Sequence, residues 1–160
     1  MSGFVFTSRG EDDTARLGAV LAECLPVPAV VALCGTLGAG KTRLVQAVAQ
    51  AAGVDRQRVV SPTFVLVQQY EGRVPIFHVD AYRLRDEDEF LQLGPEEFFE
   101  APAWTFLEWA DRVAACLPRQ RVEIRIEVTG DTSREFHVTA TGDRYAPLVE
   151  RLARVIDKGW

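Results

Sequence analysis

Apolar residues recur along the chain at two spacings, and these spacings predict its helices and strands. In residues 11–25, apolar side chains return every three or four positions and acidic residues occupy the first turn, which is typical of an amphipathic helix. Pro26 and Pro28 follow directly and end this pattern, since proline cannot continue a helix. The same period predicts two further helices, over residues 41–52 and 145–156.

Shorter runs rich in apolar and β-branched residues predict the strands. Residues 29–34 are continuously apolar, as a strand buried on both faces would be. Residues 121–128 instead alternate between apolar and charged side chains, so one face of this strand should lie in water. Further strands are predicted over residues 3–7, 64–70, 74–79, 103–107 and 135–141.

The order of these elements indicates the fold class. Residues 71–73 read as a hairpin turn, and two short helices are predicted over residues 86–93 and 110–117. Strands mixed with helices around one sheet indicate an α/β fold, here with an antiparallel part. Since the 160 residues contain no linker, repeat or low-complexity segment, we expect residues 1–160 to form a single α/β domain with a mixed parallel and antiparallel sheet flanked by helices.

A glycine-rich stretch lies between a predicted buried strand and a predicted helix. Residues 35–42, GTLGAGKT, match the P-loop pattern G-x-x-x-x-G-K-[ST] at every specified position. Glycines let the backbone aim several N–H groups at one anion, and the positive end of the helix dipole adds to this. We therefore predict a nucleoside triphosphate site in which Lys41 reaches the β- and γ-phosphates and Thr42 is a ligand of Mg²⁺. The other loop residues assigned to this site are Leu37, Gly38, Ala39 and Gly40.

Two acidic residues are candidates for the metal and for the reacting water. Asp80 ends the run VPIFHVD, and Glu108 follows the apolar residues of AWTFLEW, where strands of an α/β sheet usually present ligands. One carboxylate could hold Mg²⁺, directly or through water, and the other could orient the attacking water or accept its proton. A solvated acid that caps a strand end is the alternative interpretation.

A switch segment is a further hypothesis. The stretch SPTF, residues 61–64, lies between the predicted P-loop helix and the strand that ends at Asp80. A hydroxyl beside the γ-phosphate is how a switch segment senses a triphosphate, so Thr63 is a candidate for contact with the nucleotide.

Charge and cysteine content narrow the class of partner and compartment. The chain has 18 Lys and Arg residues against 23 Asp and Glu residues, with no cluster of basic residues. Because phosphate contacts need clustered cations, we do not expect the chain to hold nucleic acid by itself. Three widely spaced cysteines without a Cys/His ligand pattern indicate neither a disulfide framework nor a zinc site. Without a signal peptide or a membrane-length apolar run, a cytoplasmic protein is expected.

Taken together, these parts resemble the TsaE family, also called YjeE, of small bacterial P-loop ATPases required to make threonylcarbamoyladenosine in tRNA. The matching stretches keep the family's order and spacing over nearly the whole chain. They are LGAGKT (37–42), SPTF (61–64), HVDAYRL (78–84), LG (93–94) and LEW (107–109). A P-loop alone is common, but this combination in so short a chain is highly specific.

The resemblance implies ATP with Mg²⁺ and assigns further residues. Lys41 and Thr42 would take the phosphates and the metal, with Glu108 on the metal side and Asp80 near the water. Glu11 and Thr14 match an E-x-x-T pattern that lies by the nucleotide in the family, and Arg134 matches a late arginine near the nucleotide.

The chain departs from the family at two positions of the loop. Thr36 stands where many members have Asp. Arg43 replaces a small hydroxyl residue; a cation in a first helical turn is unfavourable unless it points at solvent or phosphate, so Arg43 is a nucleotide-binding candidate.

The resemblance also implies partners, a TsaD and TsaB pair, of which TsaD transfers the threonylcarbamoyl group to adenosine. The ATPase would support turnover of that assembly and meet tRNA only through it, with no membrane contact. A nucleotide-gated scaffold that does not hydrolyse ATP is the main rival. A small-molecule P-loop kinase is disfavoured by the acidic segment 82–99, and a GTPase by the absence of an N-K-x-D motif.

Overall fold

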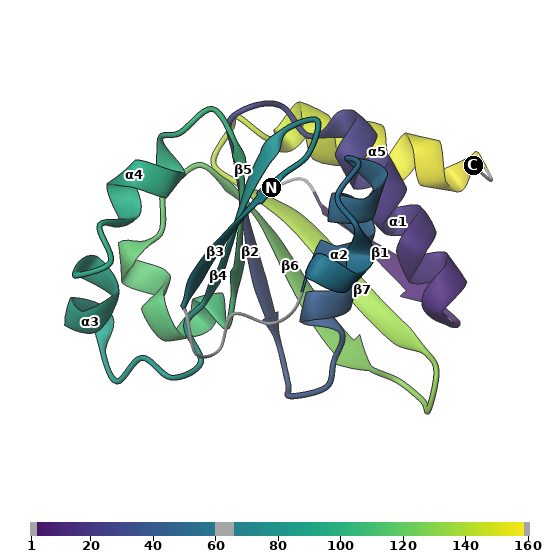
Figure 1. The fold of residues 1–160 in the computed structure, drawn as a ribbon. Coiled ribbons are helices and arrows are strands. Elements are labelled where there is room, and N and C mark those ends of the chain that lie inside the picture. Colours follow the sequence, from purple (N-terminus) through teal and green to yellow (C-terminus); the bar gives the residue numbers. More distant parts are fainter. Residues whose placement is uncertain (1–2, 60–65, 159–160) are drawn as a thin grey trace.

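One mixed sheet forms the centre of the computed structural model, which describes residues 3–59 and 66–158 (Figure 1). Over these residues the sheet has seven strands in the order β1-β7-β6-β2-β5-β4-β3. The strands β6, β2, β5 and β4 run parallel to one another. At one side β3 pairs antiparallel with β4, and at the other β7 pairs antiparallel with both β6 and β1. The strands are β1 (Gly3–Ser8), β2 (Ala29–Gly35), β3 (Val67–Glu71), β4 (Pro75–Asp80), β5 (Trp104–Glu108), β6 (Arg121–Val128) and β7 (Arg134–Thr141). The predicted mixed α/β fold is confirmed.

Helices cover the two faces of the sheet unequally. The long helices α1 (Glu11–Cys24), α2 (Lys41–Ala51) and α5 (Ala146–Asp157) lie together over one face (Figure 1). On the other face, α3 (Glu87–Leu91), α4 (Pro95–Phe99) and the 3₁₀ segment η2 (Ala110–Cys116) pack only against the β2-β5-β4 side.

The central strand β2 shows why its sequence is continuously apolar. Val31 and Leu33 pack into the core under α1 and α2, and Ala32, which points the other way, packs into the core under α3 and α4. Successive side chains of a strand point to opposite faces, so a strand covered on both sides needs no polar position. This confirms the interpretation of residues 29–34.

On β6 and β7 only one face is covered. Val122, Ile124 and Ile126 are buried under the long helices, whereas the alternate positions Arg125 and Glu127 are exposed. The predicted strand with one face in water is thereby confirmed, and the face of β6 and β7 away from the long helices carries polar side chains.

Several short elements differ from the prediction. The helix α4 was not predicted, because its sequence PEEFF is too short to show a helical period; it begins with proline directly after Gly94, whose φ of 67° suits glycine. Residues 110–116 form a 3₁₀ segment with a kink at Val113 rather than the predicted α-helix, and Arg56–Arg58 add another short 3₁₀ turn, η1. The helix α3 ends at Leu91, two residues early.

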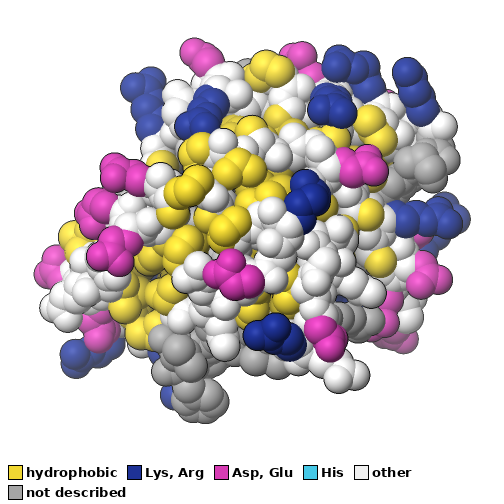
Figure 2. All heavy atoms as spheres, turned by 45° about the horizontal axis from the view of Figure 1, so that its top comes forward, with side chains coloured by type: hydrophobic (Ala, Val, Ile, Leu, Met, Phe, Trp, Pro, Cys, Tyr) yellow, Lys and Arg dark blue, Asp and Glu magenta, His cyan; other side chains and the backbone are white. Residues whose placement is uncertain are grey.

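The acidic residues at α3 and α4 lie on the surface. Figure 2, which brings the top of Figure 1 forward, shows hydrophobic side chains over the middle of that face and acidic side chains along its left edge, the side of α3 and α4. Acidic residues occupy the first turn of both helices, where the helix dipole stabilises them.

Among the described residues no helix is long and apolar enough to cross a membrane. The three cysteines are free thiols.

Candidate functional site

The glycine loop connects the end of β2 to the start of α2. Gly40 immediately precedes α2 in the left-handed backbone region, with φ of 112°, which a side chain would strain. At Gly35 a Cβ atom would lie 2.8 Å from the carbonyl oxygen of Ile126, so β6 can approach only a glycine there. Both glycines are therefore required by the path of the backbone.

A cleft of about 520 Å³ opens beside this loop. It is lined by the loop, by the first turns of α2, and by residues at or just after the ends of β4 and β5. These residues are Leu37, Gly38, Gly40, Lys41, Thr42, Arg43, Gln46, Asp80, Tyr82, Glu108 and Trp109. The structure thus brings the predicted loop residues and both candidate carboxylates to one place. Backbone N–H groups and a helix N-terminus suit an anion there.

Lys41 is a buried residue of the cleft lining and is held by its own loop. Its side chain nitrogen donates hydrogen bonds to the carbonyl oxygens of Gly35, at 2.7 Å, and Thr36, at 2.9 Å. The same nitrogen lies 3.9 Å from the centre of the Trp109 ring, a favourable cation–π distance. Burial lowers the pKa of the Lys41 amine, while Glu108 and Asp80 partly oppose this.

For the ATP ligand that the sequence predicts, the lowered pKa of Lys41 implies an affinity that depends on pH. Charge on the amine favours phosphate, and this charge is lost as the pH rises through a pKa below the ordinary value of 10.5. We expect the affinity to fall as the pH rises through this lowered pKa, at most about tenfold per pH unit beyond it. Calorimetric titration of the folded protein at a series of pH values measures this. Lys41→Ala should show no such decline, and a native affinity constant up to pH 10.5 would contradict the prediction.

Thr42 and Glu108 are directly bonded. The Thr42 hydroxyl donates to the two Glu108 carboxylate oxygens, which lie 3.0 and 2.8 Å from it. The Glu108 side chain is buried, with an exposed fraction of 3%. Glu108 ends β5, the strand next to β2, and Asp80 stands beside it in register at the end of β4. The Asp80 carboxylate is buried and accepts a hydrogen bond of 2.8 Å from the backbone N–H of Tyr82. Neither acid is a solvated cap.

A buried histidine supports Glu108 from behind. His78 is fully buried on β4, and its Nε2 lies 2.5 Å from Glu108 Oε2. Because a carboxylate can only accept, Nε2 carries the proton, and in the neutral ring Nδ1 accepts from the Tyr70 hydroxyl at 3.1 Å. Sequence analysis did not assign His78 and Tyr70 to the site, although His78 begins the matching stretch HVDAYRL and stands two residues before Asp80 on the same strand.

Replacing His78 by alanine tests this support. We expect a loss of about 1–3 kcal/mol in the free energy of unfolding, because Glu108 and Tyr70 each lose a buried partner. We also expect ATP turnover to fall more than ATP affinity, because the displaced group is a carboxylate and not a phosphate contact. Denaturant unfolding and the separation of kcat from KM measure the two effects. His78→Gln, which keeps a donor, should recover part of the turnover, and a fall in affinity alone would argue against positioning.

An aromatic pair covers one side of the cleft. Trp109 follows β5 in the left-handed region with φ of 58°, an uncommon backbone conformation for a residue with a side chain and one often found at functional sites. Its ring lies against Tyr82, with ring centres 4.7 Å apart. With this backbone conformation, the Trp109 ring lies over the Lys41 amine, although Trp109 directly follows Glu108 in the chain.

A second pocket, of about 260 Å³, lies along the loop and contains the remaining candidates. Glu11, Thr14, Arg43 and Arg134 line it together with Gly38, Ala39 and Gly40. The Arg134 side chain donates from Nε to the Ala39 carbonyl oxygen at 3.0 Å and so ties β7 to the loop. The two pockets share the loop, so the candidates from both ends of the chain surround the same segment.

Arg43 has a partner that the sequence did not suggest. It forms an ion pair with Glu11, in the first turn of α1. The unfavourable position of a cation in the first turn of α2 is thus compensated by a carboxylate from another helix rather than only by solvent. The predicted contact of Thr63 with the nucleotide lies outside the described residues.

In this mixed α/β fold, a loop with the P-loop sequence pattern follows the buried strand β2, and carboxylates from the ends of the next two strands lie beside it. The family described as "Threonylcarbamoyl adenosine biosynthesis protein TsaE" matches residues 8–136. The chain belongs to the TsaE family.

Relatives of known name agree with this placement. The chain is 41% identical over 126 residues to the tRNA threonylcarbamoyladenosine biosynthesis protein TsaE of Bacillus subtilis, covering 78% of each chain. It is 39% identical over 131 residues to the protein of that name from Treponema pallidum, covering 82% of this chain and 96% of the relative. The crystal structure of Bacillus subtilis YdiB superposes with a TM-score of 0.81 at 30% identity, covering 96% of both chains.

Proposed function

We propose that this protein binds and hydrolyses Mg-ATP, and that hydrolysis supports threonylcarbamoyl modification of tRNA adenosine by a TsaD and TsaB pair. The observation that carries the proposal is the contact between Thr42 and Glu108 beside Lys41. A P-loop hydroxyl, a strand-end carboxylate and a lysine meet in one cleft, as phosphoryl transfer in P-loop proteins requires. The biosynthetic role is supported by family membership and by the names of the relatives.

The donors present in the cleft fit Mg-ATP. The N–H groups at the start of α2 and the Lys41 amine suit phosphate oxygens. Mg²⁺ prefers hard oxygen ligands, and Thr42, Glu108 and Asp80 offer a hydroxyl and two carboxylates. The pocket lined by Glu11, Thr14 and Arg134 continues along the same loop and has room for part of the nucleoside. Bound Mg-ATP would supply a phosphoryl group that can be transferred to water.

Each residue of the cleft has a separate task in this proposal. Lys41 exchanges the carbonyl oxygens of its own loop, to which it is bonded here, for phosphate oxygens. Glu108 holds the Thr42 hydroxyl in place on the metal side. Asp80, one strand further from β2, orients the attacking water or accepts its proton. The Trp109 ring shields the Lys41 amine and so strengthens its charge interactions.

Charge supports an indirect relation to tRNA. The formal net charge of -5 and the absence of a basic cluster in the sequence disfavour direct phosphate contact with RNA. We propose that the tRNA is held by the partners, and that hydrolysis is slow until they supply missing catalytic groups; an arginine supplied in trans accelerates some P-loop enzymes by about 10³–10⁵-fold. Three free cysteines agree with a cytoplasmic location.

Reconstitution of the modification tests the proposal. The cognate TsaD and TsaB proteins, tRNA, a threonylcarbamoyl donor and ATP are combined with and without this protein, and modified adenosine is measured over many turnovers. We expect repeated turnover only when this protein and hydrolysable ATP are both present. Modification that continues unchanged without it, or with a non-hydrolysable ATP analogue, would refute the coupling.

A further inference from the structure

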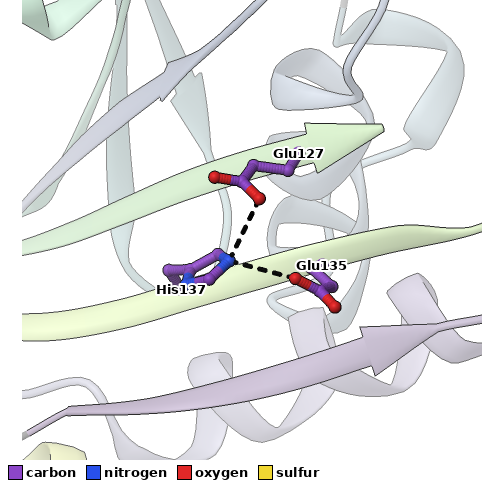
Figure 3. Close-up of side chains that lie close together, drawn as sticks. All are labelled: Glu127, Glu135 and His137. Carbon is purple, nitrogen blue, oxygen red and sulfur yellow. Dashed lines mark ion pairs between the residues drawn. The ribbon is translucent and has the colours of Figure 1, made fainter. Parts of the chain in front are cut away.

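Three side chains that the proposed function does not use lie together on the open face of the sheet. Glu127 is on β6, and Glu135 and His137 are on β7 (Figure 3). In the antiparallel pairing of these strands Glu127 stands directly opposite Glu135. His137 follows Glu135 by two positions and therefore points to the same face. The cluster is thus built by strand register, in the part of the sheet that α3 and α4 do not cover.

The two distances from the His137 imidazole match those between ligands of one metal ion. His137 Nε2 lies 3.5 Å from Glu127 Oε2 and 3.3 Å from Glu135 Oε1, and one ligand atom from each residue lies within 4.8 Å of the others. In a tetrahedral site with metal–ligand bonds of about 2.0–2.2 Å, neighbouring ligand atoms are about 3.3–3.6 Å apart. Both measured contacts from the imidazole nitrogen fall in that range.

The state of His137 Nε2 is the second observation. This atom is buried, and among the described residues it has no hydrogen-bond partner, although the Glu135 oxygen at 3.3 Å is close enough for one. The oxygen therefore lies off the axis along which the nitrogen would donate. When an imidazole nitrogen binds a metal, the metal occupies this axis, and the other ligands of the metal lie to the side of it. The Glu135 oxygen has such a position. The geometry suits an ion between the three groups better than a hydrogen bond within them.

Charge points in the same direction. Two glutamates directly opposite each other on neighbouring strands repel. Arg125 compensates only one side of this pair, since its Nε lies 3.2 Å from Glu127 Oε1. The oxygen Oε2 of the same carboxylate faces the imidazole instead. A divalent cation between Oε2, Glu135 and His137 would remove the remaining repulsion.

We propose that Glu127, Glu135 and His137 form a binding site for a divalent transition metal ion of the Zn²⁺ class, separate from the nucleotide site. One imidazole and two carboxylates suit such an ion, and three protein ligands leave a fourth position open. The cluster borders a groove of about 970 Å³ that Glu127 and His137 line together with Gly35 and Thr36 of the loop. The open position can therefore take water or a donor group of a molecule in that groove.

Sequence analysis found no Cys/His pattern of metal ligands and did not identify this cluster, and strand register explains why. The usual patterns place ligands at short fixed spacings along the chain. Here Glu127 and Glu135 are brought opposite each other by the β6–β7 pairing. Neither residue stands out in the sequence from other charged residues of the two strands.

Cobalt binding provides the test, since Co²⁺ occupies such sites and four-coordinate Co²⁺ absorbs visible light. Untagged, chelator-treated protein is titrated with Co²⁺ and then with Zn²⁺. We expect saturable absorption that Zn²⁺ displaces, and an affinity at least about tenfold lower in His137→Gln and in Glu135→Gln, since each loses one of three ligands. The chain has two histidines, and the other, His78, is buried and bonded to Glu108.

Two controls make the outcome decisive. Glu108→Gln should leave Co²⁺ absorption unchanged, because it alters only the nucleotide site, and Cys34→Ser should also leave it unchanged, because no thiolate takes part. His137→Gln should bind Mg-ATP as the native protein does, which shows that it is folded. Absence of saturable absorption, an unchanged affinity in His137→Gln, or loss of absorption in either control would overturn the proposal and leave His137 as the cation of an ordinary charge cluster.

Discussion

Replacing Lys41 by alanine is expected to abolish measurable ATP hydrolysis and to weaken Mg-ATP binding by about 10- to 150-fold. The affinity estimate corresponds to the loss of one charge-assisted hydrogen bond, about 1.5–3 kcal/mol. The loss in rate should be larger, about 10²–10³-fold, because the amine also stabilises charge that develops in the transition state. Its amine is bonded to the loop and lies under the Trp109 ring, and no other lysine lines the described cleft to replace it.

The chain supplies its own control for this experiment. It contains only two lysines, and the second, Lys158, lies on the surface just after α5. Lys158→Ala removes the same charge and should change neither ATP affinity nor turnover. Calorimetric titration and phosphate release measure both variants. An unchanged affinity in Lys41→Ala would show that the loop is not a phosphate site.

Replacing Glu108 by alanine is the second large effect, and it separates chemistry from binding. We expect ATP turnover to fall by about 10²–10³-fold, the typical cost of removing a group that acts in the transition state. Affinity for ATP should change only a few-fold, since the loop and Lys41 remain. Binding to the TsaD and TsaB pair should persist. Glu108→Gln, which keeps the shape of the side chain, shows whether the loss reflects charge rather than packing.

Glu71 provides the matched acidic control for Glu108. It also ends a strand, β3, but it is exposed and bonded to Gln69 instead of to the loop. Glu71→Gln should therefore leave both ATP turnover and partner binding at native levels. If Glu108→Ala binds partners and still supports tRNA modification at the native rate, ATP acts only by ordering a partner surface, and the hydrolytic proposal fails.

Local patterns predicted the elements whose burial is regular. The continuous run in β2 and the alternation in β6 follow directly from covered and uncovered faces, so period alone located them. The helix α4 and the 3₁₀ segment η2 failed this approach. Each is too short to show a period, and Phe98, which anchors α4 in the core, looks the same in sequence as a strand residue.

For the candidate site, too, local patterns indicated some residues and gave no sign of others. Candidate residues of the loop could be named because phosphate binding imposes a contiguous pattern, and Asp80 and Glu108 could be named because each ends an apolar strand. The support of Glu108 by His78 and Tyr70 depends on pairing between β3, β4 and β5, which no local pattern encodes. The ion pair of Arg43 with Glu11 likewise depends on how α1 and α2 pack. Contacts across strands and between helices could not be predicted from the sequence.

Phosphate release from Mg-ATP by the purified protein, alone and with the cognate TsaD and TsaB pair, tests the central claim most directly. We predict slow release by the protein alone and strong stimulation by the pair, with both activities lost in Lys41→Ala and Glu108→Ala. Calorimetric titration on the same samples establishes that ATP is bound. Bound ATP without turnover in either condition would contradict the claim, and would make Asp80 and Glu108 structural ligands of a nucleotide-gated scaffold.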